Sequence, residues 1–423
     1  MEHVKGLTQA EVAAAFAEWS EPPYRAGQLL QWLYARRVTD WEAMTNLSKA
    51  LRQRLRERWI LDVIHPVRQQ GSEDSTLKVL WQLADGAMVE SVLIPANPAL
   101  YGETSDRLTL CVSTQVGCAY GCAFCASGLQ GWKRNLGAHE IVEQVLATER
   151  LLARPTPERS ADIVHTLEET LPMRRVRARG PQAAISIPGG HVPSRGVGEN
   201  ETPATTSEPR DRAISNLVIM GMGEPLANYD NLLKALLILN APWGGGIGAR
   251  KITISTSGLA PQIRRLAEEP FQFRLAISLH GATDAVRSQI MPVNRKYPLA
   301  ELAAACEYYL QTTGRVLTFE YILIAGINDG RDQIKPLADL AHRLRAKVNL
   351  IPYNTVEGLS WQRPAPEQQE DFLRALERLD VPATLRREKG GNIDAACGQL
   401  RLKTERELRE AAAPNPSNAP APS

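Results

Sequence analysis

The sequence predicts an α/β fold, namely a partial (β/α)6 barrel with a small N-terminal helical domain and a β-hairpin extension. From residue 108 onward, short apolar runs of β type alternate with helical patterns, which is typical of a parallel sheet covered by helices. Polar and cysteine-bearing motifs follow the ends of these runs, where sites lie in folds of this class. The change from helical to β-type patterns before residue 108 predicts the two smaller parts.

Length and composition are those of a globular protein with more than one domain. The chain has 423 residues, of which 43% are apolar and 23% charged, so two or three domains are expected. The net charge of +2 does not by itself indicate a nucleic-acid-binding protein, so that role would require a local basic patch. The sequence has no run of about 18 apolar residues and no signal-like N-terminus, so we expect a cytoplasmic protein without a membrane span.

Residues 1–62 are expected to form the N-terminal helical domain. Thr8 and Glu11 have the spacing of a capping box, in which each side chain satisfies a free backbone N–H group of the other residue. Three apolar stripes at helical spacing follow. Arginines lie after the second stripe and around the third, at Arg36, Arg37, Arg52, Arg54, Arg56 and Arg58. They form either a solvated helix face or a surface that contacts nucleic-acid phosphates.

Residues 63–104 are expected to form a β-rich connector that packs on the barrel. Two alternating β-type runs, 77–83 and 88–94, flank Ala84-Asp-Gly-Ala87, which is a hairpin turn pattern. Glu90 lies among apolar neighbours on the second run. The pattern alone favours an outward-facing polar residue at this position.

Residues 105–410 are expected to form the barrel from six βα units. The β-type runs are Leu108–Val112, Leu217–Met220, Ile252–Ser255, Leu275–Leu279, Phe319–Ile324 and Val348–Ile351. The helical patterns are His139–Leu152, Tyr229–Asn240, Pro261–Glu268, Leu299–Thr312 and Ile334–Ala346. The carboxyl ends of parallel strands meet at one edge, and we expect the site there.

Distinctive motifs follow most of these runs. A cysteine loop follows the first run, Gly221–Pro225 follows the second, and Ser255–Gly258 ends the third. Ser278–His280 ends the fourth run, and Pro352–Asn354 follows the sixth. Because these motifs share one edge of the predicted sheet, together they indicate one ligand site more strongly than any motif does alone.

Two segments have the composition of disordered chain. Residues 155–212 are rich in Pro, Gly, Ser, Thr, Glu and Arg and are far longer than an ordinary helix-to-strand connection. We interpret them as a disordered insertion, in which His165 and His191 are solvated rather than metal ligands. Residues 411–423 have the composition of a disordered tail.

Three of the six cysteines form a tight cluster, Cys118, Cys122 and Cys125. Such a cluster indicates metal or redox chemistry rather than a disulfide framework. Two interpretations remain open, a zinc site completed by a distant fourth ligand or a [4Fe-4S] cluster with one iron open to a ligand. The aromatic residues Tyr120 and Phe124 and the position after a strand of the βα series favour the iron–sulfur cluster.

The other three cysteines lie apart from this cluster. Cys111 lies on the first strand of the series, and Cys397 lies in a glycine-containing segment after the last βα unit, where we expect a loop. Cys306 lies in the middle of a predicted helix and has the setting of a small core residue.

The cysteine spacing, with an aromatic residue directly before the last cysteine, resembles that of the radical S-adenosylmethionine (SAM) enzymes. The chain apart from the insertion and the tail resembles one family of these enzymes, the RlmN/Cfr-type adenine methyltransferases of RNA. The resemblance rests on residues 24–32, 44–48, 109–118, 276–280 and 394–400. The long insertion and changes such as Ser127-Gly128 depart from the family pattern but touch no matched functional position.

The resemblance implies a radical SAM barrel, its cofactors and the residues that bind them. Cys118, Cys122 and Cys125 would hold one [4Fe-4S] cluster, whose open iron binds SAM and cleaves it to a 5′-deoxyadenosyl radical. Two SAM molecules are consumed in each methylation. The implied SAM-binding residues are Gly223, Glu224, Ser255, Ser278, Leu279, His280 and Asn354, and Glu224 is expected to pair with the SAM ammonium group.

The resemblance also implies a route to carbon C2 of adenine, which is too electron-poor to attack a SAM methyl group directly. Cys397 first carries the methyl group as S-methylcysteine and, after hydrogen abstraction, bonds to the ring through that carbon. Glu90 accepts the ring proton. Cys111 then forms a transient disulfide with Cys397 and releases the methylated RNA.

The implied substrates are an adenine of 23S rRNA near the peptidyl-transferase centre and the adenine next to the anticodon of some tRNAs. An electron donor such as flavodoxin is implied, a monomer is expected, and basic runs such as residues 386–389 are expected to contact phosphates. Three alternatives remain open. They are methylation at C8 of the same rRNA adenine, a radical SAM enzyme acting on a protein or small molecule, and a non-catalytic, zinc-stabilised RNA-binding protein.

Overall fold

A computed structural model of the chain describes residues 1–72, 75–96, 105, 107–129, 131–153, 212–356, 358–386 and 398–412. The predicted insertion, with His165 and His191, lies outside the described residues except for Arg212. Cys397 and residues 413–423 also lie outside them. The proposals on the insertion and on the position of Cys397 therefore stay predictions.

The N-terminal helical unit forms as the sequence predicts. The Thr8 N–H donates to Glu11 Oε2 at 2.7 Å and the Glu11 N–H donates to Thr8 Oγ1 at 3.3 Å, which completes the capping box. Phe16, Leu29 and Leu55, one from each apolar stripe, are at most 1% exposed. The elements are β1 (Glu2–His3), η1 (Val4–Gly6), α1 (Gln9–Glu18), α2 (Tyr24–Leu30), η2 (Gln31–Ala35), η3 (Trp41–Ala43), α3 (Lys49–Arg58) and β2 (Trp59–Ile60).

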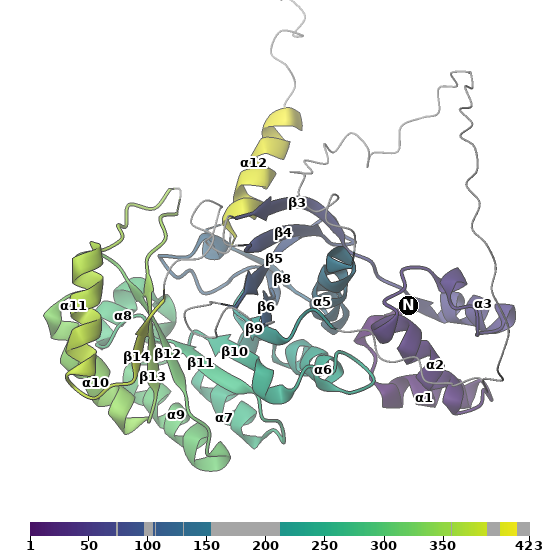
Figure 1. Cartoon of the computed structure of the whole chain (residues 1–423), viewed down its shortest axis with the longest axis horizontal. Coiled ribbons are helices and arrows are strands. Elements are labelled where there is room, and N and C mark those ends of the chain that lie inside the picture. The colour runs from purple at the N-terminus through teal and green to yellow at the C-terminus, as the bar shows by residue number, and fades with distance from the viewer. Residues whose placement is uncertain are drawn as a thin grey trace, which may run out of the picture. The chain divides into compact units, whose positions relative to one another are not determined.

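Ten strands form one sheet in the order β14-β13-β12-β11-β10-β9-β6-β5-β4-β3 (Figure 1). From β14 to β6 neighbouring strands are parallel, and from β6 to β3 they are antiparallel. The parallel strands are β6 (Leu108–Cys111), β9 (Asn216–Ile219), β10 (Ile252–Thr256), β11 (Arg274–Ser278), β12 (Thr318–Leu323), β13 (Lys347–Pro352) and β14 (Ala383–Leu385). The six predicted βα strands are thus confirmed, and the short β14 adds one that the sequence pattern did not indicate.

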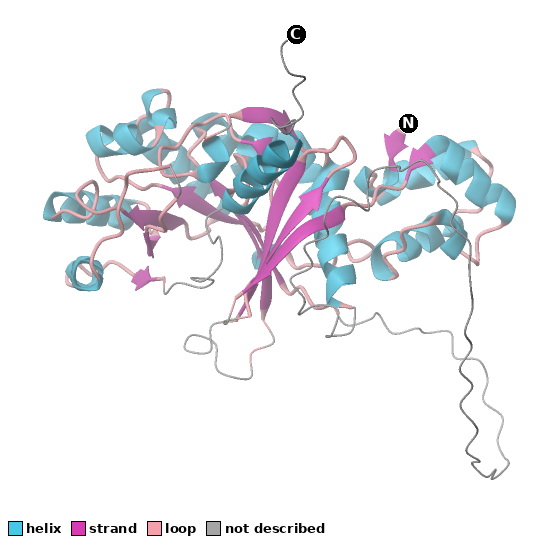
Figure 2. Ribbon diagram, turned by 90° about the horizontal axis from the view of Figure 1, so that it is seen from above, coloured by secondary structure: helices cyan, strands magenta, loops and turns pink. Residues whose placement is uncertain are grey.

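Helices follow these strands and flank the sheet, which forms the inner layer in Figure 2. They are α5 (Ala138–Leu152), η7 (Pro225–Asn228), α6 (Tyr229–Asn240), η8 (Ala249–Lys251), α7 (Ala260–Glu268), α8 (Asp284–Ile290), η9 (Pro292–Arg295), α9 (Leu299–Thr313), η10 (Arg331–Gln333), α10 (Ile334–Arg343) and α11 (Pro366–Glu377). All five predicted helices are present. Within the described ranges, no helix combines the length and the apolar character needed to cross a bilayer.

The β-extension has three strands and corrects the predicted hairpin. β3 (His65–Gly71) pairs with β4 (Leu77–Gln82), which pairs with β5 (Met88–Pro95). Because β3 contains Pro66 and few β-branched residues, its sequence does not have the usual strand pattern. The predicted turn is confirmed, since Gly86 has a φ of +81° and the Leu83 N–H donates to Ala87 O at 2.8 Å.

The chain continues after the barrel as α12 (Gln399–Ala412). Residues 411 and 412 therefore belong to a helix, whereas the sequence placed them in a disordered tail. In Figure 1, α12 lies beside β3 and β4 of the extension. The polar, charged composition of this helix explains why its first turns were not recognised as an element that covers a sheet.

Candidate active site

The three clustered cysteines line one cavity at the carboxyl ends of the parallel strands. The cavity has a volume of about 300 Å³ and is lined by Cys118, Cys122 and Cys125. The Ala123 N–H donates to Ile290 O at 2.9 Å and so anchors the loop to α8. The short strands β7 (Gln115–Gly117) and β8 (Trp132–Asn135) pair with each other, and the turn η4 (Ala126–Gly128) lies between them along the chain.

Gly117 shapes the start of the cysteine loop. Its φ is +80°, and a Cβ atom at this position would lie 2.0 Å from Gly131 O. The Cys118 N–H donates to the same carbonyl oxygen at 3.1 Å. A side chain at position 117 would therefore both strain the backbone and displace the first cysteine.

The environment of the thiols fits a bound cationic centre. Burial raises the pKa of Cys118 to about 12 and raises the pKa of Cys122 well above its usual value. Thiolates therefore require a positive partner here, which a metal centre supplies. Among the described residues, no fourth cysteine lines the cavity, so the set of three thiols fits an iron–sulfur cluster with one iron left open.

Six of the seven predicted SAM-binding residues line this cavity. They are Gly223, Glu224, Ser255, Ser278, His280 and Asn354. Leu279 is not among the lining residues; it is 1% exposed, its N–H donates to Glu320 O at 3.0 Å, and its role in SAM binding stays a prediction. The Ser255 and Ser278 hydroxyl oxygens lie 3.4 Å apart at the ends of β10 and β11, so two strand ends present a pair of hydroxyls to one ligand.

His280 is held as a neutral imidazole whose Nε2 carries the proton. The Ile322 N–H donates to His280 Nδ1 at 3.0 Å, which assigns the proton to the other nitrogen. Burial, with Arg287 adding to it, lowers the pKa of His280 to about 3. The backbone has a φ of +55°, and the ring meets Phe124 of the cysteine loop edge-on at 4.8 Å. His280 therefore supports the cysteine loop and offers one N–H donor.

The Glu224 carboxylate connects the ends of β9 and β10. Oε1 accepts hydrogen bonds from Leu226 N–H at 3.0 Å and Thr256 Oγ1 at 2.7 Å, and Oε2 accepts one from Ser257 N–H at 2.7 Å. The residue is 3% exposed, and burial raises the pKa of its carboxyl group. Its pairing with the SAM ammonium stays a prediction, since these bonds give the carboxylate a structural role as well.

Register places Lys78, Glu90 and Cys111 on one face of the sheet. Lys78 and Cys111 both pair with Val92, from opposite sides, and Glu90 precedes Val92 by two residues. Side chains alternate along a strand, so all these residues point the same way. Glu90 and Cys111 are diagonal neighbours on adjacent strands.

Helix α12 covers this face of the sheet. Leu400, in its first turn, packs in one apolar cluster with Leu80 and Met88, which share the face with Glu90. On the opposite face, Ser91 Oγ donates to Gln144 Oε1 of α5 at 3.0 Å. Glu90 is therefore buried at 2% exposure, and the outward-facing position favoured by its strand pattern is wrong.

The cavity is also lined by residues that were not among the predicted cluster ligands and SAM-binding residues. Tyr120, Ser257, Glu320 and Tyr353 line it. The Ser257 hydroxyl is buried and has no hydrogen-bond partner within the described chain, so a bound ligand could supply one. Glu320 accepts a hydrogen bond from Asn349 Nδ2 at 2.7 Å. Ser257 lies within the Ser255–Gly258 motif, whereas Glu320 lies inside β12 and only the assembled barrel brings its side chain to the cavity.

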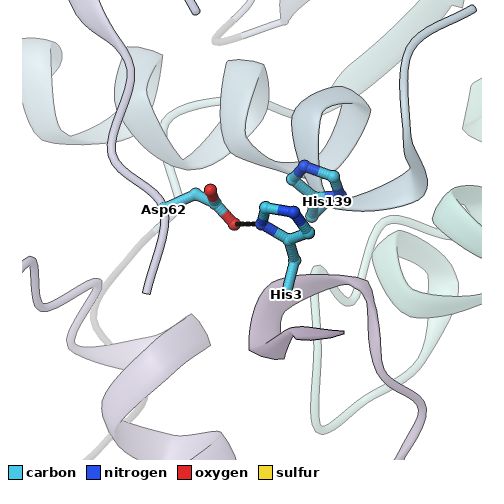
Figure 3. Close-up of side chains that lie close together, drawn as sticks. All are labelled: His3, Asp62 and His139. Carbon is cyan, nitrogen blue, oxygen red and sulfur yellow. Dashed lines mark hydrogen bonds and ion pairs between the residues drawn. The ribbon is translucent and has the colours of Figure 1, made fainter. Parts of the chain in front are cut away.

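A second polar cluster, formed by His3, Asp62 and His139, joins the N-terminal unit to α5 (Figure 3). Its ligand-type atoms lie within 4.8 Å of one another, and Asp62 Oδ2 lies 2.6 Å from His3 Nδ1. The two imidazole rings are parallel within 1° at 3.7 Å. Lone pairs in parallel ring planes do not converge on one ion, so the cluster is better described as a structural junction.

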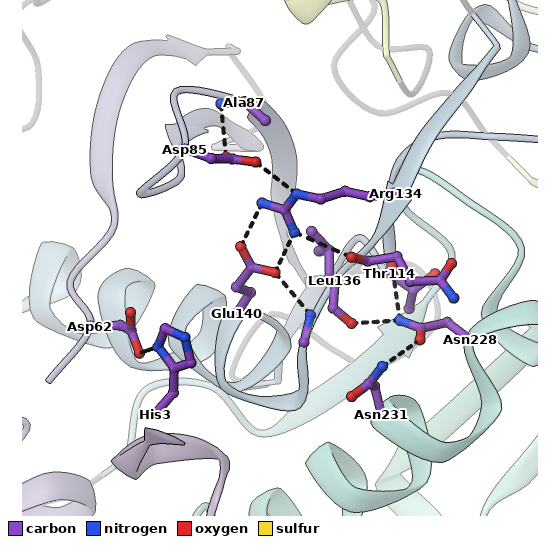
Figure 4. A network of polar contacts seen from close by, with 12 residues as sticks. His3, Asp62, Asp85, Ala87, Thr114, Arg134, Leu136, Glu140, Asn228 and Asn231 are labelled. Atoms are coloured by element: carbon purple, nitrogen blue, oxygen red, sulfur yellow. Dashed lines mark hydrogen bonds and ion pairs between the residues drawn. The ribbon is translucent and has the colours of Figure 1, made fainter. Parts of the chain in front are cut away.

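Arg134 ties the turn of the β-extension to the amino end of α5 (Figure 4). Its guanidinium donates to both oxygens of Glu140 at 2.7 and 2.8 Å and to Asp85 Oδ2 at 2.8 Å. Asp85 Oδ1 in turn accepts from the Ala87 N–H at 3.1 Å. This network fixes β8, and with it the end of the cysteine loop, relative to the β-extension.

The arginines of the N-terminal unit differ in role. Arg52 is buried, and its Nη1 donates to Met44 O at 3.2 Å and Leu47 O at 3.1 Å, so it supports the fold. Arg37 pairs with Glu149 of α5 at 3.3 Å. The exposed members are Arg36, Arg54, Arg56 and Arg58, and these remain candidates for phosphate contact.

Comparison with known proteins gives matches along nearly the whole chain. Residues 3–61 match the family described as "Ribosomal RNA large subunit methyltransferase N-terminal domain", and residues 206–341 match the "Radical SAM superfamily". The chain is 47% identical over 408 residues to the "Probable dual-specificity RNA methyltransferase RlmN 3" of Opitutus terrae, with 96% of each protein covered. It is 41% identical over 397 residues to the "Dual-specificity RNA methyltransferase RlmN" of Anaeromyxobacter dehalogenans, with 94% of this chain and 91% of that protein covered.

A solved structure agrees with these matches. The crystal structure of a radical SAM methyltransferase from Sphaerobacter thermophilus is similar with a TM-score of 0.75 and 38% identity, over 94% of this chain and 99% of that one. The similarity spans the N-terminal unit, the β-extension and the barrel.

Proposed function

The chain belongs to the RlmN family of radical SAM RNA methyltransferases, and from this we propose that it methylates C2 of an adenine in 23S rRNA near the peptidyl-transferase centre. The adenine next to the anticodon of some tRNAs is proposed as a second substrate. The observation that carries the proposal is the sheet face on which Glu90 and Cys111 lie together, covered by a helix that begins two residues after Cys397.

The cofactors of the family are a [4Fe-4S] cluster and SAM, which together supply a radical able to abstract a hydrogen atom from a methyl group. Cys118, Cys122 and Cys125 would hold the cluster, and the residues that line the cavity would hold SAM. The neutral His280 offers a donor, and the Ser255 and Ser278 hydroxyls offer donors and acceptors. These groups orient the ligand without adding a charge to a cavity that already contains Glu224 and Glu320.

The remaining roles belong to groups at or near the shared sheet face. Cys397 is proposed to carry the transferred carbon on its sulfur and to bond through it to the adenine ring, and the unpaired electron that this addition leaves on the ring would return to the [4Fe-4S] cluster held by Cys118, Cys122 and Cys125. Glu90 is proposed to accept the proton that leaves C2, in a setting only 2% exposed to water. Cys111 is proposed to attack the Cys397 sulfur, so that an S–S bond forms while the S–C bond breaks and its electron pair stays with the carbon, which takes up a proton.

RNA is proposed to reach the cavity from the side of the strand ends. Arg386 lines the cavity, which supports a phosphate contact near the target base, and residues 387–389 lie outside the described chain. The exposed arginines of the N-terminal unit provide a second positive surface. A cytoplasmic monomer that receives electrons from a donor such as flavodoxin completes the proposal.

The test is methylation of unmodified RNA by the purified, anaerobically reconstituted protein. A 23S rRNA fragment and a tRNA pool are incubated separately with SAM and a reductant, and the nucleosides are identified by mass spectrometry. We expect 2-methyladenosine from the rRNA fragment and from a subset of tRNAs. Cys118→Ala is the matched control, because it removes a proposed cluster ligand from the same loop.

Other products would contradict parts of the proposal. Formation of 8-methyladenosine alone would refute the choice of C2, and methylation of rRNA alone would remove tRNA from the substrates. A colourless protein that contains zinc, lacks iron and binds RNA without modifying it would favour the non-catalytic alternative.

A further inference from the structure

The Glu90 carboxylate joins β4 to the amino end of α12. Lys78 Nζ lies 2.9 Å from Oε2, the Gly398 N–H donates to Oε2 at 2.8 Å, and the Arg401 N–H donates to Oε1 at 2.7 Å. The side chain of Lys78 is fully buried and that of Glu90 is 2% exposed. A buried carboxylate is stable as an anion when a cation and several donors surround it, and these three contacts provide both.

The two N–H donors belong to the start of a helix. The first backbone N–H groups of a helix have no partner within the helix, and side chains near in sequence usually bind them. In α12 a carboxylate from a distant strand has this role. Its negative charge also lies at the positive end of the helix dipole, which adds to the attraction.

Gly398 fixes this segment against the cysteine loop. Its φ is +87°, and a Cβ atom here would lie 2.8 Å from Ser127 Oγ and 2.9 Å from Ser127 N. Ser127 belongs to η4, the turn that directly follows Cys125. Consecutive Cα atoms are about 3.8 Å apart, so the contacts that hold Gly398 also limit the reach of its neighbour Cys397.

We infer that Lys78 is a positioning residue, which holds Glu90 as an anion so that Glu90 ties the segment after Cys397 to the sheet, at the place where Gly398 packs against Ser127 of the cysteine loop. This inference rests on the proposed roles of Glu90 and Cys397. It links two steps of the reaction, since the carboxylate that takes up the ring proton also anchors the segment that carries the transferred carbon. Glu90 Oε1 accepts one described hydrogen bond, from the Arg401 N–H, and a carboxylate oxygen has about two acceptor positions. Oε1 can therefore bind the proton from the adenine ring while the hydrogen bonds to Gly398 and Arg401 persist.

The test is amide hydrogen–deuterium exchange of the purified protein without RNA or SAM. Lys78→Met is expected to raise the exchange rate at Gly398 and Arg401 by at least about tenfold, because the Glu90 carboxylate that accepts both hydrogen bonds then lacks the buried cation that holds it in place. Lys78→Arg keeps the cation and is expected to stay closer to the wild type. The matched control is Lys133→Met, which removes the half-exposed lysine of β8 that lies 3.6 Å from Glu405 of α12 and is expected to leave the exchange at Gly398 and Arg401 unchanged.

A double-mutant cycle separates positioning from general loosening. In a Glu90→Gln background, adding Lys78→Met is expected to change the exchange at 398 and 401 by less than about twofold, because Lys78 acts through Glu90. Lys78→Met could also raise the exchange rates of β4 and β5. In that case the double variant Lys78→Met/Glu90→Leu replaces the buried ion pair by two apolar side chains and restores packing on that face. The amides of residues 398 and 401 should still exchange fast in this double variant, because they have lost their acceptor. Protection equal to the wild type in Lys78→Met, or in that apolar pair, would overturn the inference.

Turnover distinguishes this inference from the proposed function. Lys78→Met is expected to lower kcat for methylation while the KM for RNA stays within about twofold, since the Lys78 side chain is fully buried. If the exchange result holds but the wild type methylates no RNA, the proposed function fails and the positioning of the segment stands. If the wild type methylates RNA and Lys78→Met changes neither exchange nor kcat, the inference alone fails.

Discussion

Glu224→Ala is expected to destabilise the protein as well as to weaken SAM binding. The carboxylate is 3% exposed and accepts three hydrogen bonds, from Leu226 N–H, Thr256 Oγ1 and Ser257 N–H. Alanine would leave two backbone N–H groups without an acceptor, whereas the threonine hydroxyl can rotate to another partner. The variant therefore tests whether this residue is mainly a ligand for SAM or mainly a link between two strand ends.

The magnitude follows from the two orphaned groups. Each buried, unsatisfied N–H costs about 1–3 kcal/mol, so the free energy of unfolding should fall by roughly 2–5 kcal/mol once water from the adjoining cavity offsets part of the loss. Burial raises the pKa of this carboxyl group, which means that the buried charge itself costs free energy. Removing the charge therefore offsets a further part of the stability that is lost with the hydrogen bonds. Glu224→Gln keeps one acceptor oxygen and should lose about half as much.

The assay is thermal unfolding of the metal-free protein, followed by SAM binding to the reconstituted protein. Glu224→Ala should melt roughly 2–6 °C below the wild type, and Glu224→Gln should lie between them. Asp230→Ala, which removes an ion pair whose acidic side chain is 83% exposed, is the control and should melt with the wild type. A melting point unchanged within about 1 °C, together with a loss of SAM affinity of about tenfold or more, would refute the structural reasoning and identify the SAM ammonium as the main partner of the carboxylate.

Three further predictions concern the cysteines and the histidine junction. Cys111→Ala should accumulate protein covalently linked to RNA, which a shifted band on a denaturing gel would detect; absence of any adduct would remove Cys111 from its resolving role. Cys118→Ala should lose iron, the brown colour and all turnover, whereas Cys306→Ala, in the core, should retain all three. Burial lowers the pKa of His139 below its usual 6.5, so the unfolded chain binds more protons than the folded one as the pH falls below that value. The free energy of unfolding of the metal-free protein should therefore decrease below pH 6.5 by up to about 1.4 kcal/mol per pH unit, and an unchanged slope in His139→Gln would assign that loss to other groups.

The sequence predicted the barrel and the edge of its site because parallel strands end where their polar motifs begin. Ser255, Ser278 and His280 follow apolar runs whose ends can be located within a residue or two. In a parallel sheet those ends are neighbours whatever the details of packing. Leu279, between two residues that line the cavity, does not itself line it, and its role in SAM binding stays a prediction.

The environment of Glu90 could not be predicted from its strand. One face of the β4–β5 pair carries two apolar and two charged side chains, namely Leu80, Met88, Lys78 and Glu90. Only the covering helix α12 decides that the charged half is buried. That helix begins 309 residues later in the chain than Glu90, at Gln399, and its own sequence is dominated by charged side chains. No local pattern records such a contact, and Lys78 was missed for the same reason.

The separation of Glu90 from its helix partners has a consequence for how the enzyme is made. The two N–H groups that bind Glu90 lie 308 and 311 positions further along the chain. At about 5–20 residues per second, the ribosome needs roughly 15–60 s after Glu90 to add them. The clustered cysteines Cys118, Cys122 and Cys125 are synthesised early in that interval, whereas Cys397 and the helix after it come only at its end. A nascent chain that stops before residue 397 would thus contain the three proposed metal ligands but lack Cys397, the proposed methyl carrier, so on the proposed mechanism the enzyme would gain its activity only when its own synthesis is nearly complete.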